Sequence, residues 1–294
     1  MFFLLISSLF LITHDILPLL PYETGATECI ETVSGGGTNE NFHLALGQDH
    51  YFVRFGNEGA SLLGANIENE YICTKLTVDA GLAPPLFLFL PEKKVLVSSF
   101  IPSSKEVNLR ELSTLSRLAK QVKILHRLPS RFPKTVDPLA VIQSYHTLAM
   151  QKGIAIPEAY LKIALKTSQK LPHRPSVPCH LDLHKGNLID DGHTLWLIDW
   201  EYASMADPLF DLAILSATEH FSDSEMESLL ELYDAPEPQA KEWLTYFRIL
   251  ADLRWGYWCL IQEQDSQLDY PYREEAKKFL SDALFRAKQN LLHE

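Results

Sequence analysis

Two carboxylates and one amide stand at a spacing that suits phosphoryl transfer. Asp182 is followed five residues later by Asn187, and twelve residues further on Asp199 ends an apolar run. Transferring a phosphoryl group from a nucleotide requires an acid that orients the attacking hydroxyl and oxygen ligands that hold Mg²⁺ on the phosphates. Carboxylate and amide oxygens suit Mg²⁺ because they are hard ligands. The sequence therefore predicts a kinase-like site, with a strand–turn–strand returning Asp199 to the loop that carries Asp182.

Three features upstream agree with a nucleotide site. The glycine-rich stretch 34–38 predicts a hairpin turn whose backbone N–H groups can approach phosphates without a Cβ in the way. Arg54 lies on the predicted third strand, where kinases place the cation that binds phosphates. Glu70 lies on the predicted helix that follows, and its carboxylate could pair with Arg54. The order of these elements along the chain matches that of a kinase.

A metal-hydrolase site is the alternative interpretation of the same segment. His180, Asp182 and His184 alternate, so on a strand all three would point to one face and could bind zinc. That interpretation leaves Asn187 and Asp199 without roles, and we favour the kinase-like site for this reason. His180 and His184 are then expected to be structural residues that hydrogen-bond around the loop.

The elements that must position these residues fall into two groups. The first hundred residues predict an antiparallel sheet and one helix over 60–80. Strands are expected at 27–33, 41–46, 51–55, 86–90 and 95–101. The apolar run 2–12 continues at helical spacing to Leu20, which predicts an amphipathic helix packed on this sheet, with membrane association or a signal segment as the alternative.

The rest of the chain is predicted to be mainly helical. The first helix is expected to begin at Asn108, capped with Glu111, and to end near His126, which caps it or lies in the core. Its expected core stripe is Leu112, Leu115, Leu118, Val122 and Leu125. Further helices are expected at 137–152, 158–170, 208–220, 222–233, 240–263 and 272–292, interrupted by a strand-rich segment at 177–199.

This pattern predicts a bilobal α+β fold. The N-terminal nucleotide-binding lobe would span residues 1–101, including an N-terminal helix at 1–22. The larger, mainly helical C-terminal lobe would span 102–294 and carry the catalytic and substrate-binding residues, with 102–104 as the hinge.

Composition limits the classes of partner. Among 294 residues, 26 Lys and Arg oppose 38 Asp and Glu, for a net charge of −12, which disfavours nucleic acid because phosphate binding needs clustered positive charge. The 46% apolar share excludes a disordered chain. The four cysteines form no CxxC pair, which disfavours zinc knuckles and redox dithiols and indicates reduced thiols in a cytosol. No stable membrane insertion is expected, because run 2–12 is too short to span a bilayer.

Five segments carry a family resemblance. They are Ser-Gly-Gly-Gly-Thr-Asn-Glu-Asn-Phe at 34–42, Tyr-Phe-Val-Arg-Phe-Gly at 51–56, Leu-His at 125–126, Cys-His-Leu-Asp-Leu-His-Lys-Gly-Asn-Leu at 179–188 and Ile-Asp-Trp-Glu-Tyr-Ala at 198–203. Together they resemble the choline/ethanolamine kinases, within the aminoglycoside-phosphotransferase-like group of small-molecule kinases. The resemblance covers roughly residues 15–290, and its most specific part is the segment 198–202 followed by Asp207, Pro208 and Asp211.

The resemblance implies a protein-kinase-like fold with ATP between the lobes, and it implies residue roles. Asp182 would be the catalytic acid/base, with Asn187 and Asp199 as Mg²⁺ ligands. The nucleotide would be bound by Ser34, Gly35, Gly36, Gly37, Thr38, Asn39, Arg54, Glu70, Ser99 and Ile101. The substrate would be bound by Glu201, Tyr202, Trp255, Trp258 and Tyr270.

The aromatic residues have a physical rationale of their own. Trp255 and Trp258 are three apart on a predicted helix and therefore share a face. A trimethylammonium group cannot donate an N–H hydrogen bond, so aromatic faces and nearby carboxylates hold it best. The alternative is that these residues belong to the core, as aromatic stripes at helical spacing commonly do.

The resemblance therefore implies a cytoplasmic enzyme that phosphorylates choline, or ethanolamine, with ATP and Mg²⁺, giving phosphocholine and ADP. A homodimer is compatible with it. The alternatives are a kinase for another small alcohol, such as thiamine or an aminoglycoside, and an inactive nucleotide- or amine-binding module. The chain has Arg54 where protein kinases have lysine, and Trp200 follows Asp199 in place of the Asp-Phe-Gly triplet. A protein substrate is therefore not expected.

Overall fold

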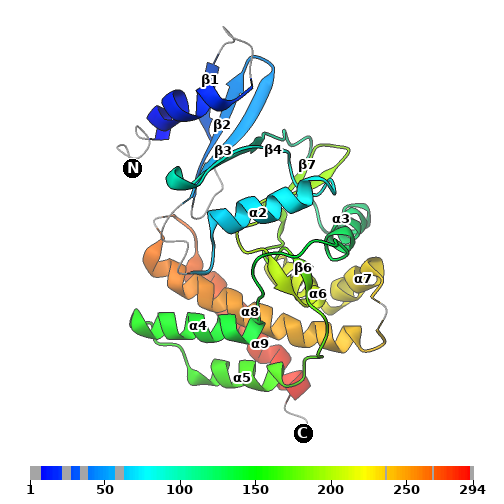
Figure 1. Cartoon of the computed structure of the whole chain (residues 1–294). Coiled ribbons are helices and arrows are strands. Elements are labelled where there is room, and N and C mark those ends of the chain that lie inside the picture. The colour runs from blue at the N-terminus through cyan, green and yellow to red at the C-terminus, as the bar shows by residue number, and fades with distance from the viewer. Residues whose placement is uncertain are drawn as a thin grey trace.

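The N-terminal part of the molecule is an antiparallel sheet, and the remainder is mostly helical (Figure 1). The computed structural model describes residues 8–21, 28–33, 39–56, 63–235, 237–266 and 268–291. This arrangement confirms the predicted α+β kinase-like fold. The proposed boundary between lobes at residues 101 and 102 stays a prediction.

The sheet has the strand order β1-β2-β3-β5-β4. Its strands are β1 (Glu28–Thr32), β2 (Glu40–Leu46), β3 (Asp49–Phe55), β4 (Leu86–Leu90) and β5 (Val95–Ser99). β2 and β3 form a tight hairpin in which Leu46 pairs with Asp49. All five strands agree with the sequence prediction to within two residues at each end.

The N-terminal segment packs on one face of this sheet. Residues 8–11 begin a helical segment that continues as a π-helical turn, η1 (Ile12–Ile16), and a 3₁₀ turn, η2 (Leu17–Leu19). Ile12, Ile16, Leu17 and Leu20 are buried against Phe42, Leu44, Leu46, Val53, Val95 and Val97. This confirms the predicted packing for residues 8–20, and no helix in the described ranges is both long and apolar enough to cross a membrane.

Two predicted helix starts are wrong. The helix expected over 60–80 is α2 (Ile67–Val78), which begins where the Asn66 side chain accepts a hydrogen bond from the N–H of Asn69. The helix expected from Asn108 is α3 (Leu112–Leu125). Asn108 instead makes a turn, because its side chain accepts from the N–H of Arg110.

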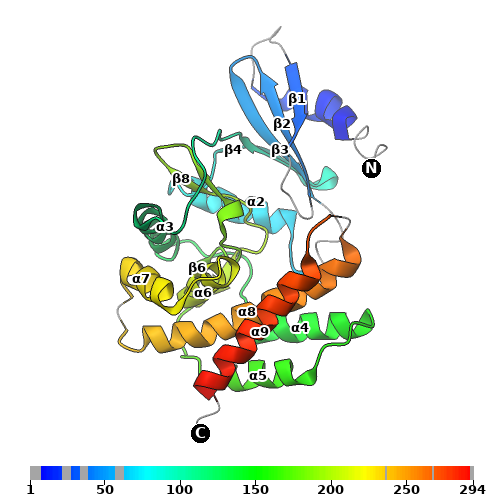
Figure 2. The same cartoon turned by 180° about the vertical axis from the view of Figure 1, so that it is seen from behind.

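The helical lobe otherwise follows the predicted pattern. Its helices are α3, α4 (Pro138–Gln151), α5 (Glu158–Ser168), α6 (Pro208–Thr218), α7 (Asp223–Tyr233), α8 (Ala240–Asp265) and α9 (Tyr272–Leu291). In α3 the expected core stripe is buried except for Leu112, which is exposed. α9 crosses α8 closely (Figure 2), and a Cβ on Gly256 would lie 2.6 Å from Leu280 Cδ2.

The segment 177–199, predicted to be rich in strands, carries Asp182, Asn187 and Asp199. It contains β6 (Val177–Cys179), the 3₁₀ turn η5 (Lys185–Asn187), β7 (Leu188–Asp190) and β8 (Leu195–Leu197). β7 pairs with β8, which returns the chain toward Asn187 as predicted. β6 pairs with β9 (Ser204–Ala206), a three-residue strand that the sequence analysis did not predict.

Candidate active site

The loop after β6 is held by a buried aspartate on α6. Asp211 Oδ2 accepts from the N–H of His180 at 2.8 Å, and Asp211 Oδ1 accepts from the N–H of Leu181 at 2.6 Å. Leu181 has a φ of 61°, a left-handed conformation that costs a non-glycine residue free energy. Arg254 on α8 donates to the carbonyl oxygen of Leu181 at 2.8 Å. Fixed partners on both sides of Leu181 thus determine where the next residue, Asp182, lies.

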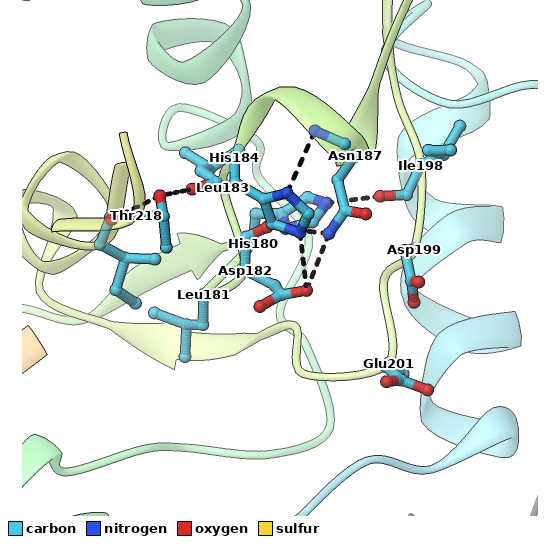
Figure 3. A network of polar contacts seen from close by, with 12 residues as sticks. His180, Leu181, Asp182, Leu183, His184, Asn187, Ile198, Asp199, Glu201 and Thr218 are labelled. Carbon is cyan, nitrogen blue, oxygen red and sulfur yellow. Dashed lines mark hydrogen bonds and ion pairs between the residues drawn. The ribbon is translucent and has the colours of Figure 1, made fainter. Parts of the chain in front are cut away.

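Asp182 and Asn187 form a rigid pair. Asn187 Nδ2 donates to Asp182 Oδ2 at 2.7 Å and to the Asp182 backbone oxygen at 2.9 Å (Figure 3). Both N–H bonds of the amide are therefore used within the loop, which leaves Asn187 Oδ1 as its free ligand atom. Asp182 is 6% exposed, and its Oδ1 is buried with no protein partner in the described part of the chain. A buried acceptor without a partner is uncommon, so the Asp182 carboxylate retains capacity for one more hydrogen bond.

Arg54 joins the sheet to Asp199. Its Nη1 donates to Glu70 Oε1 and to Asp199 Oδ1, both at 2.8 Å, and its Nη2 donates to Asp199 Oδ2 at 3.1 Å. The predicted pair with Glu70 is thus present. Burial disfavours the charged guanidinium, but the charges of Asp199 and Glu70 outweigh it and hold the pKa of Arg54 well above its ordinary value. Burial also opposes ionisation of Asp199, yet Arg54 lowers the pKa of this carboxyl.

Glu201 adds a third carboxylate to this cluster. Its Oε2 accepts from Asn39 Nδ2 at 3.1 Å. Burial, with the charge of Asp199, raises the pKa of Glu201 well above its ordinary value, and burial raises the pKa of Glu70 to about 7. Carboxylate oxygens of Glu70, Asp199 and Glu201 lie within 4.8 Å of one another. A single guanidinium does not neutralise three carboxylates, so the cluster takes up either protons, as the raised pKa values indicate, or an additional cation.

These residues fit a Mg²⁺ ion. The available donors near Asn187 and Asp199 are oxygens, which Mg²⁺ prefers over nitrogen and sulfur ligands. Glu70 Oε2 is buried without a protein partner among the described residues, so the cluster also retains acceptor capacity. Asn187 Oδ1 and the Asp199 carboxylate would hold the ion, with the carboxyl oxygens of Glu70 and Glu201 nearby.

A single cavity of about 1060 Å³ gathers the predicted catalytic and substrate residues. Asp182, Asn187 and Asp199 line it together with the five predicted substrate residues, Glu201, Tyr202, Trp255, Trp258 and Tyr270. These five follow Asp182 by 19 to 88 residues in the sequence, and the fold brings them to the same cavity.

Aromatic rings form one wall of this cavity. Trp255 and Trp258 contact edge to face at a centroid distance of 5.2 Å, and Trp255 stacks on Phe279 at 6.3 Å. Tyr272, which the sequence analysis did not single out, contacts both Trp258 and Tyr270. The predicted shared face of the two tryptophans is therefore present, and both rings are half-buried rather than enclosed in the core.

Arg254 lies behind this wall. Its guanidinium is over the Tyr202 ring at 5.1 Å and over the Trp255 ring at 5.4 Å. The same side chain holds Leu181, so it connects the aromatic wall to the catalytic loop. Arg254 was not singled out from the sequence, and Asp211 was named only within the family resemblance, without a role. The signal that could have given them one is a charged residue inside an otherwise apolar helical stripe, which must have a buried partner.

Some predicted nucleotide residues lie elsewhere. Ser99 and Ile101 line a separate pocket with Tyr51 and Phe87, not the cavity that contains Asp182. Ser34, Gly35, Gly36, Gly37 and Thr38 lie outside the described residues.

The histidines have structural partners. His180 Nε2 meets the carbonyl oxygen of Ile198 at 3.0 Å, and His184 Nδ1 accepts from the N–H of Gly186 at 3.1 Å. The segment from His180 to His184 is a loop rather than a strand, so the rings do not share a face as the zinc interpretation requires. His126 is buried between Tyr233 and Asp211, which makes it a core histidine at the end of α3.

Several known proteins are similar to this chain. The model of a family described as the phosphotransferase enzyme family matches residues 30–244. Protein LicA of Haemophilus influenzae is 26% identical over 275 residues, covering 87% of this chain and 79% of that protein. Thiamine kinase of Shigella boydii is 30% identical over 135 residues, covering 46% of this chain and 47% of that protein. The crystal structure of choline kinase LicA from Streptococcus pneumoniae superposes with a TM-score of 0.82 at 24% identity, covering 96% of this chain and 99% of that one, which shows a shared fold.

Proposed function

The chain belongs to the phosphotransferase enzyme family, and from this premise we propose that it transfers the γ-phosphoryl group of ATP to the hydroxyl of choline, with ethanolamine as a second substrate. One observation carries the proposal. Asp182 lines the same cavity as the aromatic wall that contains Trp255 and Trp258, and its carboxylate retains one oxygen, Oδ1, without a protein partner among the described residues. A quaternary amine bound at that wall would therefore share a cavity with a carboxylate that can accept its hydroxyl proton.

In this mechanism Asp182 orients the choline hydroxyl and takes its proton. The hydroxyl oxygen forms a bond to the γ-phosphorus while the bond from that phosphorus to the β–γ bridging oxygen breaks, and ADP leaves. Asn187 holds the Asp182 carboxylate in one orientation through two hydrogen bonds. Arg54 contributes positive charge beside the phosphates. When bound at Asn187 and Asp199, Mg²⁺ would neutralise phosphate charge.

The substrate residues would act through shape and charge. Trp255, Trp258 and Tyr270 would offer aromatic faces to the trimethylammonium group, and Glu275, which also lines the cavity, would add a carboxylate. Such a wall discriminates against a primary ammonium, which needs hydrogen-bond acceptors that aromatic faces do not supply.

Thiamine is the second candidate substrate. The partial match to thiamine kinases favours it, since that match covers nearly half of the chain. Thiamine also carries a quaternary nitrogen and a primary hydroxyl, so the same wall and the same Asp182 could serve it.

A substrate panel tests the proposal. Purified protein with Mg-ATP would be given choline, ethanolamine, thiamine or an aminoglycoside, and ADP formation would be followed. We expect the highest kcat/KM with choline and a lower value with ethanolamine. A higher kcat/KM with thiamine would assign the second candidate. ADP formation with none of the four would leave a nucleotide- or amine-binding module.

A further inference from the structure

His184 stands at the N-terminal end of the turn η5 with its ring fixed in one orientation. Its Nδ1 accepts from the N–H of Gly186, two residues later, at 3.1 Å (Figure 3). A neutral imidazole that accepts at Nδ1 carries its proton on Nε2. The turn therefore determines which ring nitrogen is the donor as well as the orientation of the ring.

The donor nitrogen faces the catalytic carboxylate. His184 Nε2 lies 3.8 Å from Asp182 Oδ2, the oxygen that also accepts from Asn187 Nδ2 at 2.7 Å (Figure 3). At 3.8 Å this contact is electrostatic rather than a full hydrogen bond. Two donors thus lie on the Oδ2 side of the carboxylate, whereas Oδ1 has no protein partner in the described chain. The two oxygens of Asp182 are therefore not equivalent.

We propose that His184 is a positioning residue that, with Asn187, holds Asp182 Oδ2 and so fixes the orientation of the Asp182 carboxylate for the substrate hydroxyl. The inference rests on the proposed function and adds a residue to it. His184 lines the cavity, its side chain is 32% exposed, and its ring meets the Trp255 ring edge to face at 6.5 Å. In the transfer step the hydroxyl proton moves to the Asp182 carboxylate, and His184 keeps its own proton throughout.

Gly186 makes this arrangement possible. A Cβ at this position would lie 2.7 Å from His184 Cε1 and 2.9 Å from His184 Nδ1, closer than such atoms approach. Apart from the two adjoining residues, the three atoms nearest to that Cβ position all belong to the His184 ring, the third at 3.9 Å. An alanine at 186 would therefore displace the imidazole first. Gly186 therefore affects the catalytic carboxylate only through His184, and the effects of substituting the two residues on kcat should not be additive.

That coupling gives a double-mutant test. Steady-state kcat and KM for choline and ATP would be measured in wild type, His184→Ala, Gly186→Ala and the double variant. We expect His184→Ala to lower kcat about tenfold while both KM values change less than about twofold, because ground-state binding does not use the imidazole. Gly186→Ala should lower kcat to a similar degree in the wild-type background. In the His184→Ala background, adding Gly186→Ala should not lower kcat further.

A control and two readouts separate the alternatives. His193→Gln, in the exposed turn between β7 and β8, should leave kcat unchanged. If Gly186→Ala lowered kcat by the same factor in both backgrounds, the inference would be overturned. An unchanged kcat in His184→Ala would also overturn it. A loss shared equally between kcat and KM, accompanied by a lower thermal midpoint, would show that the histidine only supports the loop and would also overturn it. Wild-type protein that forms no ADP with choline, ethanolamine or thiamine would fail the proposed function itself, and the inference with it.

Discussion

Arg54 and Asp199 are 145 residues apart in sequence and meet through two parallel hydrogen bonds, Nη1 to Oδ1 at 2.8 Å and Nη2 to Oδ2 at 3.1 Å. Asp199 adopts a left-handed conformation, with a φ of 66°, at the point of contact. A bidentate pair of this kind fixes both position and angle. It therefore sets how the sheet that carries Arg54 lies relative to the loop that carries Asp199, and both residues belong to the proposed nucleotide site.

The first prediction is that Asp199→Ala abolishes productive Mg-ATP binding. The substitution removes a proposed metal ligand and leaves Arg54 paired with Glu70 alone, so the position of the guanidinium is less constrained. Binding of ATP would be measured calorimetrically with and without Mg²⁺. We expect the enhancement of affinity by Mg²⁺ to disappear. An unchanged Mg²⁺ enhancement would contradict the metal-ligand assignment.

The second prediction is that Asp182→Asn lowers kcat at least about 10²-fold, since proton acceptance and hydroxyl orientation are lost together. The amide is nearly isosteric and can still accept from Asn187, so the fold and nucleotide binding should persist. Turnover, ATP affinity and the thermal midpoint would be measured on one preparation. Near-normal turnover would show that another group takes the proton.

The sequence could predict the elements and the residues of this site better than their local geometry. The sequence pattern predicted each of the helices α2 to α9, though not the 3₁₀ turn η5, because long amphipathic patterns determine which face is buried. The capping pattern placed the start of α3 at Asn108, which is too early. An Asn with a Glu three residues later also suits an isolated turn, and Asn108 makes such a turn by accepting from the N–H of Arg110. The family resemblance is confirmed by the relatives and the shared fold.

Two kinds of feature could not be predicted. The bonds from Asp211 to the catalytic loop join residues about 30 positions apart, and no local pattern encodes such a contact. Likewise, the coupling of Gly186 to His184 depends on a ring orientation that appears only when the loop is folded. Contacts between side chains that are distant in the sequence can be identified only in the folded structure.

The third prediction concerns the metal. Activity should require Mg²⁺ or Mn²⁺ and survive a zinc-selective chelator, because the proposed ligands, Asn187 and Asp199, are oxygen donors. ADP formation would be measured after exhaustive dialysis and re-addition of each ion. Stoichiometric zinc in purified protein, lost on mutating His180 and His184, would restore the hydrolase interpretation.

The fourth prediction concerns stability and pH. Asp190 at the end of β7 accepts from Arg117 at 2.6 and 3.0 Å, and this pair lowers the pKa of Asp190 to about 2. An acid with a lowered folded-state pKa stabilises the protein above its unfolded pKa, and this contribution is lost as pH falls toward the folded value. Asp190→Asn should therefore lower the free energy of unfolding by about 2 kcal/mol at pH 7 and by about half as much at pH 3.

Urea unfolding of both proteins across pH 3 to 7 checks this prediction. Asp269→Asn, at an exposed position, serves as the control and should leave the free energy of unfolding unchanged. A difference between wild type and Asp190→Asn that is constant over the whole range would mean that the carboxylate stabilises the turn by shape rather than by charge.

The last prediction concerns the aromatic wall. If Trp255 and Trp258 contact the trimethylammonium group, replacing either by alanine should raise KM for choline about five- to thirtyfold, or about 1–2 kcal/mol, because one cation–π face and its apolar contact disappear. KM for ATP should change little. In the wild type, ethanolamine should have the higher KM, since its primary ammonium is costlier to desolvate and Glu201 supplies only part of the acceptors it needs.

Trp243→Ala is the matched control, because Trp243 lies on the same helix but packs against Arg174 outside the cavity. KM for choline, ethanolamine and ATP would be measured in all four proteins together with thermal midpoints. Equal increases in KM for choline and ATP, with a large drop in midpoint for Trp255→Ala and Trp258→Ala, would show that these tryptophans support the fold rather than the substrate.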